Sequence, residues 1–191
     1  MNSSLTDPTD EAVAKRVQAG EVAQFGILVE RFEAKMRRYA KKFLFGYMDA
    51  EDVVQEVFLK AFANIQSFDA TRSFSSWIYR IAHNEFINAI KKRGREPLSF
   101  FDPDTLFPHP SVSDNTDREL DQGLLKRTLD ACLEQLDAKY REPLVLYFFE
   151  DMDYEGISQI MHIPVSTVGV RLARGKQMLK KIYTANHHGQ Q

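Results

Sequence analysis

The sequence predicts an all-α protein of two small helical bundles joined by a flexible linker. Apolar residues recur at spacings of three and four through most of the 191 residues, and no segment alternates apolar and polar residues as a strand would. The exception is residues 94–115, which hold four prolines and no helical period. Such a segment is typical of a linker. We therefore predict a first domain, a linker, a second domain and a disordered tail at residues 1–94, 95–121, 122–183 and 184–191.

Four helices are predicted in the first domain, at about residues 11–19, 21–44, 49–65 and 74–93. Gly20 and Gly46 end the first two. The third opens at Asp49, and residues 67–73 interrupt the pattern before the fourth. The apolar stripe predicted for the third helix consists of Val54, Phe58, Ala61, Phe62 and Ile65.

Helix is predicted to resume around Asp117, before the second domain, and another helix is predicted after Asp137. Residues 153–181 then read as a short amphipathic helix, the turn His162–Pro164 and a basic helix, which is the layout of a helix-turn-helix. Proline is well placed near a helix start, where its missing N–H costs nothing. The buried stripe predicted for the last helix consists of Val165, Val168, Leu172, Gly175, Leu179 and Ile182.

Composition excludes several classes of protein. With 43% hydrophobic residues, 27% charged residues and a net charge of −2, the chain is an ordinary globular protein and no polycation. The single cysteine, Cys132, excludes a disulfide framework and a cysteine metal site. We expect no signal peptide and no membrane insertion, and hence a cytoplasmic protein. No nucleotide-binding loop, nucleophile elbow or zinc spacing occurs, and His83, His109 and His162 look isolated, so we expect no cofactor, no metal and no catalytic residue.

The basic helix is the first candidate binding surface. No Asp or Glu follows Glu155, and Thr167, Val170, Arg171 and Arg174 fall opposite the predicted stripe. Arginine can pair with guanine in the major groove, and threonine or valine can meet a thymine methyl. The alternative is an ordinary solvated basic face, which the complete helix-turn-helix disfavours.

A second candidate surface follows the helix at 74–93. An aromatic ring, amides and cations on one helical face are what unstacked single-stranded bases require. The alternative is a core tryptophan beside ordinary surface polar groups. The face consists of Trp77, Arg80, Asn84, Asn88 and Lys91, followed by Lys92 and Arg93.

The helix at 49–62 supplies the third surface, where Leu59 lies among the polar residues Asp52, Gln55, Glu56 and Lys60. An exposed leucine ringed by charge indicates a protein contact, although single exposed apolar residues are also common. A catalytic pair of Asp52 and Glu56 is the weaker interpretation, because no histidine or metal-ligand pattern accompanies it.

Together these segments resemble the bacterial RNA polymerase sigma factors of the extracytoplasmic-function (ECF) group. The resemblance is carried by four segments in the family's order, Phe25–Phe32, Asp49–Phe62, Phe74–Asn84 and the helix-turn-helix. It implies a transcription initiation factor that binds core polymerase and promoter DNA, is a monomer when free, and has an anti-sigma partner. It also implies that the free chain binds promoters poorly.

The resemblance assigns a role to each surface. The helix at 49–62 would grip the polymerase clamp through Asp52, Gln55, Glu56, Leu59 and Lys60. The loop 68–73 and the face from Trp77 to Arg93 would melt the minus-ten element and capture a flipped base. The last helix would read the minus-thirty-five element through Ser166, Thr167, Arg171, Arg174 and Lys176 and rest on the polymerase flap. The acidic linker would thread toward the catalytic cleft.

Four residues depart from the family pattern. His162 replaces a turn glycine at a position that favours positive φ. Gly169 and Gly175 replace better helix formers, which weakens the helix by about 1 kcal/mol each relative to alanine. Glu85 stands where the family often has leucine, and the sequence offers no account of it.

Two other functions compete with this one. A stand-alone helix-turn-helix regulator would form a homodimer on a palindromic operator without polymerase. A helical adaptor would bind only protein and tolerate neutralisation of its basic helix. The sequence names neither the promoter and its regulon, nor the inducing signal, nor the anti-sigma partner.

Overall fold

A computed structural model describes residues 7–45, 49–94 and 122–188 of the chain. Within these ranges the secondary structure is eight α-helices and two short 3-10 helices, and no strand occurs. The predicted all-α fold is therefore confirmed. The predicted linker, residues 95–121, lies outside the described residues.

The first domain consists of α1 (Asp10–Gln18), α2 (Phe25–Phe43), α3 (Ala50–Ala63) and α4 (Phe74–Arg93). The helix predicted from residue 21 begins at Phe25, because a 3-10 turn, η1 (Val22–Gln24), precedes it. A second 3-10 turn, η2 (Ile65–Ser67), follows α3. The predicted end of α4 is confirmed, since Gly94 takes the left-handed conformation with a φ of 64° that costs glycine little.

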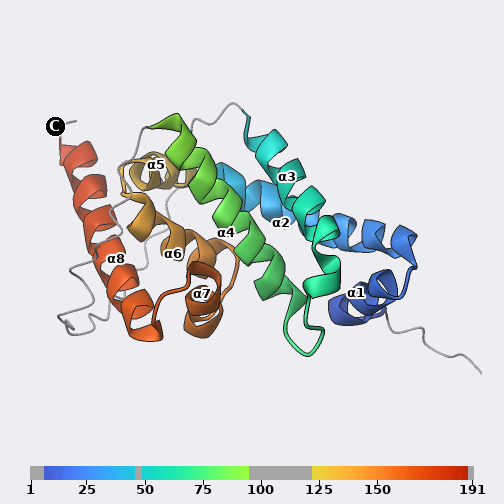
Figure 1. The fold of residues 1–191 in the computed structure, drawn as a ribbon. Coiled ribbons are helices and arrows are strands. Elements are labelled where there is room, and N and C mark those ends of the chain that lie inside the picture. Colours follow the sequence, from blue (N-terminus) through green and yellow to red (C-terminus); the bar gives the residue numbers. More distant parts are fainter. Residues whose placement is uncertain (1–6, 46–48, 95–121, 189–191) are drawn as a thin grey trace, which may run out of the picture.

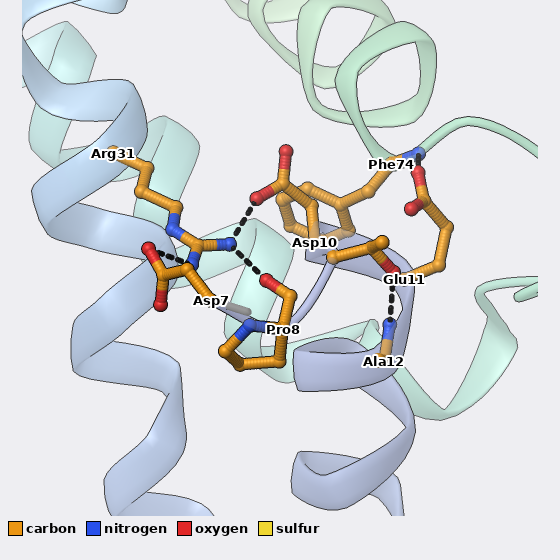
Figure 2. A network of polar contacts seen from close by, with 8 residues as sticks. Asp7, Pro8, Asp10, Glu11, Ala12, Arg31 and Phe74 are labelled. Atoms are coloured by element: carbon orange, nitrogen blue, oxygen red, sulfur yellow. Dashed lines mark hydrogen bonds and ion pairs between the residues drawn. The ribbon is translucent and has the colours of Figure 1, made fainter. Parts of the chain in front are cut away.

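A network around Arg31 ties the start of the described chain to α2 (Figure 2). The Arg31 guanidinium donates to the Pro8 carbonyl at 2.8 Å and to the Asp10 carboxylate at 2.7 Å. It also forms an ion pair with Asp7 at 3.0 Å. Asp7, Pro8 and Asp10 are thus held against α2.

The first turn of α4 is capped from two sides. The Ser73 hydroxyl accepts the Ser76 N–H at 3.3 Å, and the Glu11 carboxylate of α1 accepts the Phe74 N–H at 3.0 Å. The first N–H groups of a helix have no partner inside the helix, so these acceptors stabilise its start. α1 therefore fixes the position at which α4 begins.

The second domain consists of α5 (Gln122–Glu134), α6 (Ala138–Phe149), α7 (Tyr154–Met161) and α8 (Val165–His188). Asp153 caps α7 by accepting the Gly156 N–H at 2.7 Å, and His162 ends α7. The prediction of a disordered tail from residue 184 is wrong over its first residues. α8 continues to His188 because no glycine or proline interrupts it before Gly189.

The two domains pack directly against each other (Figure 1). α4 lies against α7, and α2 lies against α6. Buried apolar side chains from both domains form one continuous cluster. No feature of the sequence predicts this contact, because the composition of a linker does not say whether the domains that it joins touch.

Two residues of the predicted apolar stripes lie at the surface instead. Phe62 is 41% exposed and meets the ring of Phe25 edge-on at 5.1 Å between centroids, while Val57 is buried. α3 therefore faces the core through Val54, Val57 and Ala61. Val165 is 44% exposed because it is the first residue of α8, and burial begins beyond it.

Candidate nucleic-acid and polymerase interfaces

The predicted single-strand face of α4 is a continuous surface. Arg80, Asn84, Asn88 and Lys91 are exposed, as is Lys92, which follows them. The side chain of Arg93, the last residue of α4, lies outside the described residues. Cations and amides thus follow the helix for most of its length.

Trp77 belongs partly to this face and partly to the core. It is half-buried, with its ring centroid 5.2 Å from that of Phe68 and 5.5 Å from that of Phe74. The core interpretation of Trp77 therefore holds in part, and its role in stacking on a base stays a prediction. The cluster fixes the plane of the indole, and one part of the ring remains accessible.

Beside this face lies a hollow of about 740 Å³ that brings together residues far apart in the sequence. Trp77, Arg80 and Asn84 of α4 line it with the loop before α4. Asp69 shapes that loop by accepting the N–H of Thr71 at 3.0 Å and its hydroxyl at 2.7 Å. These two hydrogen bonds lower the pKa of Asp69. The loop and the α4 residues predicted to act on one base are thus neighbours.

The structure explains Glu85. Its carboxylate lies 2.7 Å from the ammonium group of Lys60 on α3, and the pair joins α3 to α4 at the hollow. This hydrogen bond raises the pKa of Lys60. Lys60 also pairs with Glu56 at 3.7 Å and is half-exposed, so its predicted contact with the polymerase stays a prediction.

The rest of the predicted polymerase surface of α3 faces solvent. Asp52, Gln55 and Glu56 are exposed, and Leu59 is 63% exposed. Leu59 borders an apolar groove between α2 and α3 of about 620 Å³. The groove is lined mainly by Val29, Val54, Phe58, Leu59 and Phe62.

The predicted duplex surface of α8 is only partly exposed. Ser166 and Lys176 are exposed, whereas Arg171 and Arg174 are half-buried and already interact with other residues of the chain. Thr167 was predicted to face DNA, and it is 3% exposed. Thr167 and Val168 are neighbours in the sequence, and both are buried. The buried side of α8 is therefore wider near its start than the predicted apolar stripe.

The helix-turn-helix turn has the predicted conformation. His162 has a φ of 54° and a ψ of 44°, in the left-handed region that glycine occupies more easily. The turn is closed by the Ser158 hydroxyl, which donates to the Ile163 carbonyl at 2.6 Å. These contacts hold the turn although the glycine is absent.

The two unusual glycines of α8 have different surroundings. A Cβ at Gly175 would lie 2.9 Å from Cδ1 of Leu144 and 3.2 Å from the Tyr140 carbonyl oxygen. Gly175 therefore lets α8 approach α6 closely. A Cβ at Gly169 would meet only Tyr154, at an ordinary 3.6 Å.

The sequence context of His83 had indicated an isolated histidine. In the structure His83 has a charged partner. Its Nδ1 lies 2.6 Å from the Glu142 carboxylate, on the other domain. Burial opposes the charged imidazolium, but the carboxylate outweighs it and raises the pKa of His83. Arg171 is close enough to act against this shift.

Across residues 7–45, 49–94 and 122–188, no group of three His, Cys, Asp or Glu side chains is arranged to hold a metal ion. None of the helices in those ranges is both long and apolar enough to cross a membrane.

Comparison with known proteins places the chain in a family. The sigma-70 region 2 model matches residues 28–96, and the sigma-70 region 4 model matches residues 126–179. The ECF RNA polymerase sigma factor SigW of Bacillus subtilis is 32% identical over 181 residues, with 87% of this chain and 92% of that protein covered. The ECF RNA polymerase sigma-E factor of Escherichia coli is 31% identical over 178 residues, covering 90% and 92%.

Solved structures share the fold. CnrH in complex with the cytosolic domain of CnrY has a TM-score of 0.69 at 24% identity, covering 93% of this chain and 98% of that one. RpoE of Bartonella quintana in complex with the anti-sigma factor NepR has a TM-score of 0.64 at 24% identity, covering 85% and 98%.

The chain therefore belongs to the sigma-70 family, and within it to the ECF sigma factors of RNA polymerase. It is a transcription initiation factor, as the resemblance in its sequence predicted.

Proposed function

We propose that this sigma factor opens promoters through the hollow beside α4. A flipped non-template base would enter between the loop 68–73 and Trp77, whose ring offers a stacking surface. Asn84 would read the base edge, and Arg80 would hold a phosphate. The observation that carries this proposal is that the loop, Trp77, Arg80 and Asn84 line one cavity.

The cations at Lys91 and Lys92, with Arg93 next in the sequence, would continue the path of the strand along α4. Each can neutralise a phosphate without reading a base. Asn88 lies between them and Asn84 on the exposed face. This division of labour predicts specificity near Trp77 and general affinity near the end of α4.

The groove between α2 and α3 is the surface that we propose for the polymerase clamp. Its apolar lining and its exposed rim residue Leu59 favour the apolar side of a partner helix. Asp52, Gln55 and Glu56 would form the polar rim. Lys60 is proposed only as a support, since it is engaged by Glu85.

We propose that α8 reads the minus-thirty-five duplex through Ser166, Arg171, Arg174 and Lys176. Thr167 would join this surface only if the start of α8 became uncovered, because it is buried in this structure. An apolar groove of about 460 Å³ between α5, α6 and α8 is our candidate site for the polymerase flap. Its lining includes Leu133, Leu144, Phe148 and Leu179.

An anti-sigma factor is a further proposed partner. The structure of RpoE, which is similar to this chain in fold, is a complex with the anti-sigma factor NepR. We propose that such a partner controls this factor in the bacterial cytoplasm, where polymerase and chromosome meet.

Run-off transcription tests the proposed function. Purified core polymerase on a randomised promoter library is expected to give defined transcripts only when the chain is added. Two variants, Asn84→Ala and Leu59→Asp, are expected to change promoter preference and to abolish polymerase binding, respectively. Absence of transcripts, together with a chain that binds a palindromic operator as a homodimer, would favour the regulator instead.

A further inference from the structure

One helix of the first domain lies outside the residues that match the sigma-70 region 2 model. That match begins at residue 28, whereas α1 spans Asp10–Gln18 and buries its apolar side in the domain. α1 contacts both the 3-10 turn η2 and α4, which come directly before and after the loop 68–73. The match to region 2 therefore assigns α1 no role, although α1 meets both ends of the loop that would receive a base.

Gln18, the last residue of α1, holds the start of the loop. Its side-chain amide donates to the Ile65 carbonyl and to the Phe68 carbonyl, at 2.8 Å each. A primary amide carries two N–H donors, so both serve this one turn. The Phe68 N–H donates to the same Ile65 carbonyl at 3.1 Å. Gln18 thus fixes the backbone at the point where it enters the loop.

Glu11, near the other end of α1, holds the end of the loop. Its carboxylate accepts the N–H of Phe74, the first residue of α4, at 3.0 Å (Figure 2). Burial by itself would raise the pKa of Glu11, but hydrogen bonds from Phe74, from its own N–H and from Thr9 outweigh burial and lower that pKa. An ionised carboxylate is a strong acceptor and suits a helix N-terminus. We call Gln18 and Glu11 the α1 brace.

The α1 brace reaches the indole of Trp77 through two phenylalanines. Phe68 is 5% exposed, and its ring centroid lies 5.3 Å from that of Phe74 and 5.2 Å from that of Trp77. Phe68 and Phe74 are also the residues whose backbone groups the brace holds. The brace therefore fixes the rings against which the indole packs, as well as the loop.

The interior of the loop is held by local hydrogen bonds. The Arg72 N–H donates to the Asp69 carbonyl at 2.9 Å, beside the bonds between Asp69 and Thr71. Asp69, Thr71, Arg72 and Ser73 are all exposed. Local bonds shape a loop, but its position on the domain depends on how its ends are attached. Both ends of this loop are attached to α1.

We propose that Gln18 and Glu11 are positioning residues for base capture. By holding the two ends of the loop 68–73, the α1 brace sets how well the loop and Trp77 discriminate the flipped base. Neither residue of the brace is among those that line the hollow, so neither is assigned a contact with the base. This inference rests on the proposed function for the base, whereas the attachment of the loop to α1 does not depend on that function.

The test compares two glutamines on opposite sides of the same contact, in the full chain. Gln18→Glu keeps the size of the side chain but replaces the two amide donors with a carboxylate, which cannot donate to either carbonyl. Gln66→Glu makes the same change in an exposed residue of η2, which donates to the Gln18 carbonyl at 3.2 Å. An effect of added negative charge near DNA should therefore appear in both variants.

Hydrogen exchange followed by mass spectrometry measures how firmly the loop is held. We expect Gln18→Glu to speed exchange of the amides at residues 68–77 about tenfold, and Gln66→Glu to change it little. Glu11→Ala should speed exchange in the same segment, while Glu11→Gln, which keeps an acceptor oxygen, should restore most of the protection. Circular dichroism checks the fold, and if Gln18→Glu fails to fold, the two Glu11 variants decide alone.

Run-off transcription with core polymerase, on a library randomised at both promoter elements, measures base preference. We expect Gln18→Glu to lower discrimination at the captured minus-ten base about fivefold, the effect of one hydrogen bond, and to leave minus-thirty-five preference unchanged. A residue that only stabilised the fold would weaken all promoters without altering the preference at one base. Asn84→Ala, measured in parallel, tests the proposed function itself.

Unchanged exchange at residues 68–77 in Gln18→Glu would overturn the α1 brace, whatever transcription gives. Equal effects of Gln18→Glu and Gln66→Glu would also overturn it, because charge alone would then explain them. Faster exchange with an unchanged minus-ten preference, where Asn84→Ala alters that preference, would overturn the positioning role and leave the proposed function standing. Faster exchange with no effect of either variant on minus-ten preference would instead reject the proposed function and leave the attachment of the loop to α1 standing.

Discussion

The two candidate DNA surfaces differ in how they are supported. The α4 face is exposed within one domain, and its first turn is fixed by Ser73 and Glu11. The α8 face is half-covered, with Thr167 buried and Arg171 close to His83 of the other domain. The difference teaches that the position of α4 is set by caps within its own domain, whereas the exposure of the α8 face depends on the arrangement of the two domains.

The largest effect on this comparison is expected from Gly175→Ala. The added methyl would press on buried Leu144 and on the Tyr140 carbonyl, which cannot move without shifting α6. We expect a loss of about 1–3 kcal/mol in the free energy of unfolding, as for other overpacked cores. Urea unfolding measures it.

Gly169→Ala is the matched control on the same helix. Ordinary contact with Tyr154 leaves room for the methyl, so the gain in helix propensity, up to about 1 kcal/mol, should dominate. Equal effects of the two substitutions would show that close approach of α8 to α6 is not what Gly175 provides.

Substitutions in the two surfaces are expected to change specificity at different promoter elements. Arg171→Ala should cost about 1–3 kcal/mol at one minus-thirty-five position, measured by run-off transcription on promoters that vary there. Asn84→Ala should relax preference at one minus-ten base only. Lys181→Ala, an exposed cation outside the proposed surfaces, is the control for charge.

Uniform weakening of all promoters by Arg171→Ala would make that arginine a phosphate contact. Unchanged start-site selection across the library would remove Asn84 from the base-reading surface.

A smaller effect is expected from pH. The pKa of His83 is raised in the folded state, so its stabilising contribution is complete below about 6.5, the ordinary value. That contribution is lost as pH rises through the folded pKa. Glu142 favours the charged ring, while Lys91 and Arg171 oppose it.

The difference in melting temperature between the wild type and His83→Gln should therefore shrink from pH 6 to pH 8. His162 titrates in the opposite sense, since burial, Arg80 and His83 lower its pKa. Because both proteins retain His162, the subtraction removes most of its contribution. A difference that grows with pH would contradict the His83–Glu142 pair.

The smallest effect is expected for Glu85→Gln. The Lys60–Glu85 pair is half-exposed on the lysine side, and such pairs contribute about 0.2–1 kcal/mol. Thermal unfolding should show that Glu85→Gln is slightly less stable than the wild type. Added salt should reduce this difference, because it screens the ion pair in the wild type. An effect above about 2 kcal/mol would mean that Glu85 supports the hollow in another way.

Helices and their ends could be predicted from local signals. Ser73, Gly94 and Asp153 mark helix boundaries through the groups beside them. The exposed face of α4 followed from spacing alone. Burial at the edges of an apolar stripe could not be predicted from spacing, as Phe62 and Thr167 show, because it depends on which elements pack there.

The side-chain network between the domains, which includes Arg38–Glu150 and His83–Glu142, could not be predicted either. Its partners are 59 to 112 residues apart in the chain, and no periodicity relates them. A buried glutamate looks like a surface glutamate in a sequence until the second domain is placed.

The packing of α1 against the loop before α4 has a consequence for how this protein can be handled. Glu11 holds the Phe74 N–H, and Gln18 donates to the carbonyls of Ile65 and Phe68 at 2.8 Å each. The amino-terminal segment therefore braces the loop that would receive a base. Trimming it, or fusing a bulky tag close to Asp7, would alter promoter opening without touching any residue that meets DNA.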